Sequence, residues 1–299
     1  MNETSSKLAK ISGWSRALMG ILMALVFAGA LAAQCPNSST PFTGEAERGK
    51  PFQAVFVQAT TSPSITGANV MIERKYRDSD GRVRTEVYVK ATGSEPEMPR
   101  IGQEDFAGED FAGVESTFGK APPELRLNFI VIDDPCSLKN YFITPGAKTV
   151  KIQGRHFNQG PFCTSIPANP GAEIPGFYGP GVHQWVQTDI LGFSSFAGVA
   201  SRGQRTSAYA SLEDKQSGHV AAFSNETWCS EELGITTASF QHQSIQKKDI
   251  KRVLRRLTRV EPDAALFEIP RDYTQFVLDS KGNFVSQPNP TAKDAPKRD

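Results

Sequence analysis

Apolar and polar side chains alternate with a period of two along three stretches of the chain. These are residues 52–61 ("FQAVFVQATT"), 70–77 ("VMIERKYR") and 83–90 ("VRTEVYVK"), and all three are rich in Val, Tyr, Phe and Thr. Such alternation is typical of antiparallel strands with one face in water. The pattern therefore predicts three paired strands.

The β pattern continues through the rest of the chain. Residues 125–134 and 140–145 flank the short turn "PCSLK" and predict another hairpin. Further strand candidates are 194–211, 219–229, 235–242 and 252–260. We expect a mainly β protein built on an antiparallel sheet.

Two long segments interrupt this pattern. Residues 92–123 hold the tandem "EDFAGEDFAG", and 153–184 are rich in Gly and Pro. Connections of this length are usually binding loops, lids or disordered insertions. The polar, Pro-containing residues 279–299 predict a disordered tail. We therefore expect one β domain over 35–278, with two insertions.

The first 34 residues have the layout of a signal peptide. Three basic residues precede an uncharged apolar run over 17–33, and Ala30-Leu31-Ala32 supplies a small-x-small cleavage pattern. A membrane anchor is the alternative, because the run is almost long enough to span a bilayer. The expected location is periplasmic or secreted.

The mature chain is nearly neutral, with 30 Lys and Arg against 31 Asp and Glu. The protein has no net positive charge that would attract nucleic acid, so we expect no nucleic-acid partner.

The four cysteines would meet an oxidising compartment after export. None has the CxxC spacing of a redox or zinc motif. We expect one disulfide among Cys136, Cys163 and Cys229, with four free thiols as the alternative.

The stretch "YRDSDGRVRTEV" looks at first like a calcium loop. Placing Gly81 at position 6 of such a loop puts Tyr76 at position 1 and Val87 at position 12, where calcium needs carboxylates. Asp and Gly also suit a tight reversal. We expect a turn at 78–81, with Arg82 and Arg84 toward water, and a similar turn at 279–282.

The motifs of common catalytic sites are absent from the sequence: it contains no GxSxG, HExxH or Walker A pattern. Cys163 could act with His156 or His183, but no oxyanion donor can be identified beside it. We therefore expect no catalytic residue, no cofactor and no metal site.

The basic stretch 247–259 carries seven basic residues in thirteen. Its apolar residues do not form a clear helical face, so it predicts a solvated strand protected by Lys and Arg. If exposed, such a segment has some affinity for anionic lipid head groups.

Three motifs resemble a family of secreted proteins of unknown function that is abundant in some soil bacteria. They are "LGFSSFAGVASRGQR" (191–205), "ETWCSEEL" (226–233) and "RVEPDAALFEIPRDY" (259–273). Their order is also distantly similar to the LolA and LolB half-barrel lipoprotein carriers. This resemblance implies a strongly curved sheet or half-barrel with an apolar concave face that holds acyl chains.

The matched positions suggest physical roles. Gly198 and Gly203 would permit a bend or bulge. Arg205 and Glu226 would form a cross-strand ion pair or remain two solvated charges, and Trp228 would be a core ring or a ligand platform. These last three residues are the candidates for ligand binding.

The function expected from the sequence is that of an exported, non-catalytic binding protein, a carrier of a hydrophobic or lipid-like envelope ligand. The alternatives are an interaction protein of the envelope without a small ligand, and a hydrolase whose site is built from the two long loops.

Overall fold

The computed structural model describes residues 49–63, 69–90, 100–101, 125–154, 173–175, 183–279 and 282–287. The chain divides into two compact units, Met1–Ser39 and Thr40–Asp299, and every described residue belongs to the second. The expectations for the signal peptide, for the insertion 92–123 apart from its residues 100–101, and for Cys163 lie outside the described residues. No helix in the described ranges is long and apolar enough to cross a membrane.

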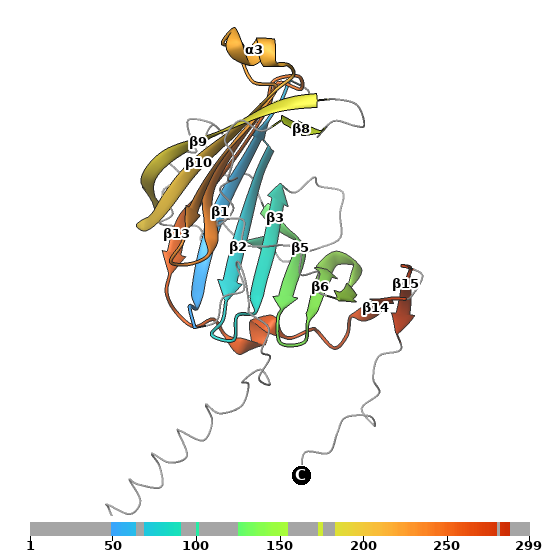
Figure 1. The fold of residues 1–299 in the computed structure, drawn as a ribbon. Coiled ribbons are helices and arrows are strands. Elements are labelled where there is room, and N and C mark those ends of the chain that lie inside the picture. The colour runs from blue at the N-terminus through green and yellow to red at the C-terminus, as the bar shows by residue number, and fades with distance from the viewer. Residues whose placement is uncertain are drawn as a thin grey trace, which may run out of the picture. The chain divides into compact units, whose positions relative to one another are not determined.

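The described residues form one 15-stranded sheet (Figure 1). The strands are β1 (Phe52–Thr61), β2 (Asn69–Arg77), β3 (Val83–Lys90), β4 (Arg100–Ile101), β5 (Leu125–Asp134), β6 (Lys139–Thr144), β7 (Thr149–Gly154), β8 (Glu173–Pro175), β9 (His183–Phe196), β10 (Val199–Tyr209), β11 (Phe223–Ser230), β12 (Ile235–Gln243), β13 (Lys248–Thr258), β14 (Thr274–Leu278) and β15 (Phe284–Gln287). Helical structure in the described residues is limited to η2 (Pro145–Ala147), α3 (Leu212–Gln216) and η3 (Ala264–Phe267). The predicted mainly β fold is confirmed.

The strand order is β15-β14-β7-β6-β5-β3-β2-β1-β13-β12-β11-β10-β9-β8, and β4 pairs with β5 beside this path. All described pairs are antiparallel except β14 with β7. The first strand, β1, therefore lies inside the sheet, between β2 and β13. On each side of it, strands that follow one another in the chain are mostly neighbours.

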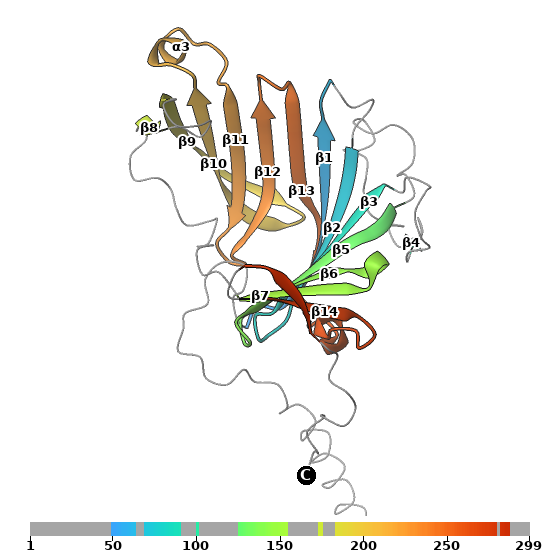
Figure 2. The same ribbon diagram turned by 90° about the vertical axis from the view of Figure 1, so that its right-hand side faces the viewer.

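Strand direction turns gradually along the sheet, from β10–β13 to β6 and β7 (Figure 2). A right-handed strand twist accumulates in this way across any large sheet. The end strands β8 and β15 do not pair with each other in the described structure, so the sheet is open. The expected strong curvature or half-barrel stays a prediction.

The predicted strands match the observed ones closely where alternation is clear. The prediction of one strand over 194–211 is wrong, because β9 and β10 form a hairpin there. Its two-residue turn is Ala197-Gly198, with φ of 49° and 74°, and positive φ at both central positions gives the twist that a tight hairpin needs. Gly198 thus serves a turn and not a bend.

Two further expectations need correction. The tail from 279 was expected to be disordered, but residues 284–287 form β15 and pair with β14. The basic stretch is a strand, as expected, but β13 is a central strand between β1 and β12 and not a protected edge.

The "DSDG" segment is a turn, as predicted. The backbone N–H of Asp78 donates to the Arg82 carbonyl at 3.1 Å, and Gly81 has a φ of 83°. The expectation that both arginines point to water is wrong. Arg82 Nε donates to the buried Asp78 carboxylate at 2.6 Å, and Arg84 Nη1 donates to the Leu266 carbonyl.

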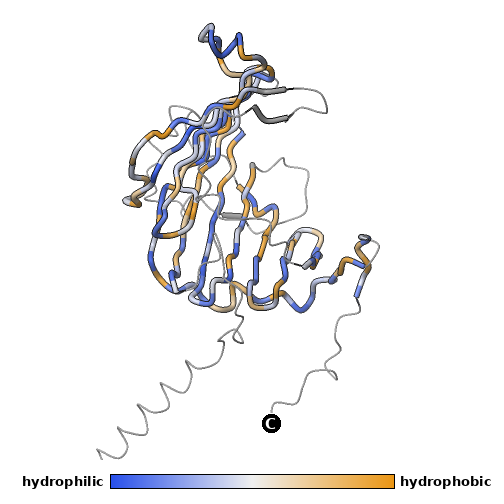
Figure 3. The backbone as a smooth tube through the Cα atoms, in the orientation of Figure 1, coloured by the Kyte–Doolittle hydropathy of each residue, from blue (hydrophilic) through white to orange (hydrophobic). Residues whose placement is uncertain are grey.

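Apolar and polar residues interleave along the strands (Figure 3), and the apolar ones form two core clusters. The larger cluster spans β1, β2, β3, β5, β6 and β7, and Phe267 of η3 packs into it. The smaller cluster joins the start of β1 to the β11–β12 connection, through Phe52, Phe56, Leu233, Ile235 and Leu254.

Candidate binding groove

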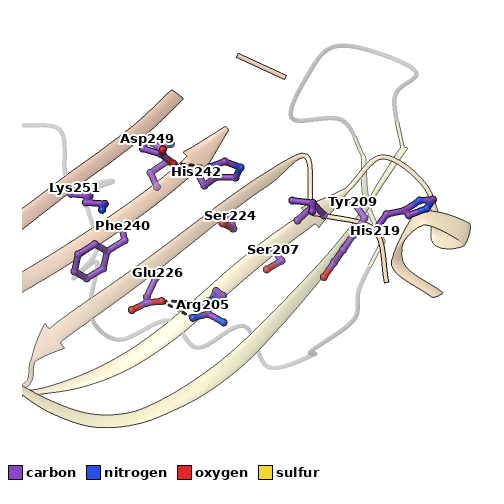
Figure 4. A pocket seen from close by; sticks show the side chains of 13 residues that line it. Arg205, Ser207, Tyr209, His219, Ser224, Glu226, Phe240, His242, Asp249 and Lys251 are labelled. Atoms are coloured by element: carbon purple, nitrogen blue, oxygen red, sulfur yellow. Dashed lines mark hydrogen bonds and ion pairs between the residues drawn. The ribbon is translucent and has the colours of Figure 1, made fainter. Parts of the chain in front are cut away.

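A groove of about 460 Å³ lies over strands β10 to β13 (Figure 4). Its floor consists of two rows of residues that face one another across neighbouring strands. One row is Arg205, Glu226, Phe240 and Lys251, and the other is Ser207, Ser224, His242 and Asp249. Residues directly opposite in antiparallel strands point to the same face of the sheet, so both rows form one surface.

The wall of the groove is the connection between β10 and β11. Residues His219, Val220 and Ala221 of this connection line the groove. α3 precedes them, and Ser211 begins this helix by accepting a hydrogen bond from the Asp214 backbone N–H at 3.0 Å. His219 Nδ1 lies 3.0 Å from Asp214 Oδ1. These contacts fold the connection back beside the sheet.

Arg205 and Glu226 form a cross-strand ion pair in the first row of the floor, between β10 and β11. Arg205 Nη2 lies 2.8 Å from Glu226 Oε2, and the two residues are directly opposite in the β10–β11 register. Trp228 Nε1 donates to Glu226 Oε1 at 2.8 Å. The predicted ion pair is confirmed, while ligand binding by these three residues stays a prediction.

Trp228 is a half-buried ring that continues the floor along β11. It packs against Phe196, with ring centroids 5.7 Å apart. A Cβ atom on Gly203 would lie 2.6 Å from its Cζ3 atom, so only glycine leaves room for the ring. The β9–β10 register shifts between Gly203 and Gln204, but the extra residue is Leu191 of β9, so the bulge expected at Gly203 lies on the opposite strand.

The second row carries a histidine and a carboxylate in contact. His242 Nδ1 lies 2.7 Å from Asp249 Oδ1, and both side chains are nearly half exposed. At the groove wall, the hydrogen bonds from His219 and Ser211 lower the pKa of Asp214. Each of these two carboxylates therefore lies beside an imidazole ring.

Lys251 is the cation of the groove that remains available to a ligand. It is exposed on β13 and makes no ion pair within the described part of the chain, whereas Arg205 shares its charge with Glu226. The floor thus presents an ammonium group beside the ring of Phe240 and the hydroxyl groups of Ser207 and Ser224.

The sheet face that carries the floor continues into the apolar half of the sheet, where its side chains are buried. Lys251 faces Ala59 of β1, which faces Val70 of β2. In the next row, Val253 faces Val57, which faces Ile72 of the larger core cluster. The same face of one sheet is therefore polar over β10–β13 and apolar over β1–β7.

Sequence reasoning missed most of the groove. It identified Arg205 and Glu226, but not the other floor residues, which are Ser207, Ser224, Phe240, His242, Asp249 and Lys251. The alternation in "FQHQ" and "KDIK" shows that these residues share a face within each strand. Their meeting with Arg205 depends on strand pairing, which a single sequence does not reveal.

The cysteines and the histidines before His219 do not build this site. Cys136 and Cys229 are both disulfide-bonded, Cys136 in the β5–β6 turn and Cys229 on β11. His156 and Cys163 lie outside the described residues, as does the side chain of His183. Within the described ranges, no group of three or more His, Cys, Asp or Glu residues could hold a metal ion.

No family model and no curated protein matches the sequence. Among solved structures, MucB is 11% identical, with a TM-score of 0.33 over 77% of this chain and 61% of its own. An uncharacterised protein of Thermus thermophilus is 11% identical, with a TM-score of 0.35 over 76% and 90%. A LolA superfamily protein of Nitrosomonas europaea is 8% identical, with a TM-score of 0.28 over 75% and 94%.

These are distant structural similarities, and at such TM-scores they carry no argument about function. The chain spans about three fifths of the length of MucB.

Proposed function

We propose that the protein is a non-catalytic binding protein of the cell envelope that takes an amphipathic, lipid-like ligand in the groove over β10–β13. The single observation that carries this proposal is one groove in which cationic and hydroxyl side chains lie beside the apolar side chains of Phe240 and Val220. A ligand with a polar head and an apolar part matches such a lining. Binding sites of this kind combine apolar walls with a few placed polar groups.

The polar groups of the groove specify the head of the ligand. Lys251 offers an ammonium group, and Arg205 has donors beyond those it uses toward Glu226. An anionic group of the ligand would contact these cations. The apolar part would pack on Phe240 and Val220, both of which line the groove.

Export through a signal peptide, a half-barrel curvature of the sheet and membership of the secreted family with the three motifs belong to the same proposal. An exported protein would meet envelope lipids and lipid-like molecules directly. A curved sheet would bring the apolar strands closer around an acyl chain.

Native mass spectrometry with lipid extraction tests the proposal. The purified mature protein, incubated with an envelope lipid extract, should carry a bound mass that extraction identifies as an amphipathic molecule. Lys251→Met should lower the bound fraction several-fold, because the ligand loses its cationic partner. Lys139→Met on β6, also exposed, is the matched control and should leave the bound fraction unchanged.

If only bare protein is found after this incubation, the binding function is wrong. If Lys251→Met and the control behave alike, the ligand lies outside the groove.

One observation favours a hydrolase as a second candidate. Ser224 lies directly opposite His242, whose imidazole contacts Asp249, so a hydroxyl, a base and an orienting carboxylate follow one another across three strands. The described structure contains no hydrogen bond between Ser224 Oγ and His242, which places this candidate second. A fluorophosphonate probe should label the wild type but not Ser224→Ala; an unlabelled wild type rejects it.

A further inference from the structure

The end of the sheet beside the groove carries two loops that are joined to each other. One is the β10–β11 connection, and the other is the β12–β13 turn. Ser244 of the turn donates its backbone N–H to the Ala222 carbonyl at 3.0 Å and its hydroxyl to the Ala221 carbonyl at 2.5 Å. The two loops therefore form one surface at this end of the strands, next to α3 (Figures 1 and 2).

Both loops carry apolar side chains that are exposed to solvent. Val220 is 77% exposed and Ile245 is 79% exposed, among the highest values of any large apolar residue in the described ranges. Leu212 of α3 adds a third, partly exposed apolar side chain. Core packing does not account for Val220 and Ile245, because side chains this exposed bury little area on folding.

Charged residues border the apolar ones. Lys247 and Lys248 follow Ile245 after the single residue Gln246, and Lys215 lies on α3. The carboxylates of the same end are Glu213 and Asp214 of α3 and Asp249 of β13, and the last two each contact a histidine. Exposed apolar side chains with lysines beside them are typical of protein surfaces that bind the interfacial region of a membrane.

We infer that this end of the sheet docks on an anionic lipid surface, with Val220 and Ile245 entering the head-group region and Lys247 and Lys248 contacting lipid phosphates. A protein partner fits less well, because a few side chains on two loop ends offer far less than the roughly 800 Å² per partner of a stable interface. A lipid surface needs no such area, since each buried apolar group and each lysine adds to the affinity separately.

Docking would place the groove beside the lipid surface, because Val220 belongs to both. The inference stands without the proposed function, since the loops and their exposure do not depend on what the groove binds. Lys251 lines the groove and Ile245 does not, so variants at these two residues distinguish failure of ligand binding from failure of docking.

The test is co-sedimentation of the purified mature protein with phosphatidylcholine vesicles that contain or lack one quarter phosphatidylglycerol. Wild type should bind the anionic vesicles more tightly, by about fivefold or more, because each lysine near such a surface contributes about 1 kcal/mol. The double variant Val220→Asp, Ile245→Asp should lose at least about tenfold in affinity, because two charged groups replace the inserting side chains.

Phe193→Asp is the matched control. Phe193 is 82% exposed, yet it lies on β9 near the Ala197-Gly198 turn, at the opposite end of these strands. This variant should bind vesicles like the wild type. The inference is overturned if wild type binds neither vesicle, or if Phe193→Asp weakens binding as much as the double variant.

A second pair, Val220→Ser with Ile245→Ser, guards against misfolding of the aspartate variant. It should weaken binding while the far-ultraviolet circular dichroism and the melting temperature stay those of the wild type. Unchanged binding by this folded pair also overturns the inference.

Discussion

At the scale of single residues, the contact between Gly203 and Trp228 fixes the floor of the groove. The indole ring occupies the space that any side chain at position 203 would fill. The ring is also held by its hydrogen bond to Glu226 and by Phe196, so it has little freedom to move aside. Glycine is required here by packing, since its φ is not in the positive range.

Gly203→Ala should therefore destabilise the fold by about 1–3 kcal/mol, the usual cost of overpacking. Urea unfolding measures it. Gly154→Ala is the matched control, because a Cβ at this β7 position meets nothing within 4 Å. If both variants unfold at the same urea concentration, the Trp228 ring moves aside without loss of stability, and the prediction is wrong.

Glu73 and Arg252 form a largely buried ion pair that joins two separate parts of the chain. Arg252 Nη2 lies 2.8 Å from Glu73 Oε1, and the guanidinium carbon lies 3.8 Å from the centroid of the Phe56 ring. Burial alone would raise the pKa of Glu73, but the charges of Lys75 and Arg252 outweigh it and lower the pKa to about 2.

This shift makes stability depend on pH in a defined window. The ionised form is favoured in the folded state, so the contribution is complete above the usual pKa of 4.5 and is lost as pH falls toward 2. It amounts to about 3 kcal/mol. Glu73→Gln should lower the unfolding free energy at pH 7 and flatten its decline between pH 4.5 and 2, measured by urea unfolding. An unchanged pH slope in this variant would contradict the assignment.

At the scale of elements, two turns of the chain share one hydrogen-bond pattern. Asp78 accepts from the Arg82 backbone N–H, and Asp279 accepts from the Asn283 backbone N–H, both at 2.8 Å. The turns differ in burial, since Asp78 is 3% exposed and Asp279 is half-buried. Burial raises the pKa of Asp78, with the Arg82 guanidinium opposing this effect.

Asp78→Ala should destabilise the protein by about 1–3 kcal/mol, because it leaves buried donors without their acceptor. Asp279→Ala should cost less, because water can replace the lost carboxylate there. Thermal unfolding compares the two. In the same assay, calcium should leave the melting temperature of the wild type unchanged, and a shift abolished by Asp80→Ala would restore the metal interpretation of this turn.

Alternation predicted the individual strands well, because each strand has a clear period of two in its own sequence. It failed where structure depends on partners. The Ala197-Gly198 turn was missed because both flanks are equally β-like, and β13 was taken for a protected strand because its lysines and arginines resemble an edge. In the structure, Arg252 of that strand serves an ion pair with Glu73, far away in the sequence.

The same limit applied to the groove. Three candidates could be named from the sequence, because they stand in two of the motifs and these motifs lie on consecutive strands that pair. They are Arg205 on β10 and Glu226 and Trp228 on β11. Lys251 and Asp249 reach the groove only through the order β10-β11-β12-β13. A single sequence shows which side chains share a strand face, but not which strands lie side by side.

At the scale of the whole molecule, strand order constrains the disulfides. Five strands separate β5 from β11, which places Cys136 and Cys229 roughly 29 Å apart along the sheet. A disulfide needs Cα atoms within about 7 Å. The two cysteines therefore belong to different bridges, and a single bridge between them is excluded.

Peptide mapping under non-reducing conditions should recover Cys136 and Cys229 in separate disulfide-linked peptides. Reduction should lower the melting temperature, because each bridge restricts the unfolded chain. A linked peptide containing both cysteines would contradict the strand order.

The position of β1 inside the sheet has a consequence for how the chain folds. The strands from β2 to β7 can pair soon after they are made, but the other edge of β1 must wait for β13, which is made near the end of the chain. Until then that edge is an open template for other chains. During refolding of the complete chain the same order is expected, because β2 is close to β1 in the sequence and β13 is far away, so pairing with β13 closes a much longer loop. Hydrogen exchange should then protect the β1 amides that point to β2 before those that point to β13, and the reverse order would contradict this. The open edge of β1, the first strand of the sheet to be synthesised, is therefore covered only when β13 has been synthesised.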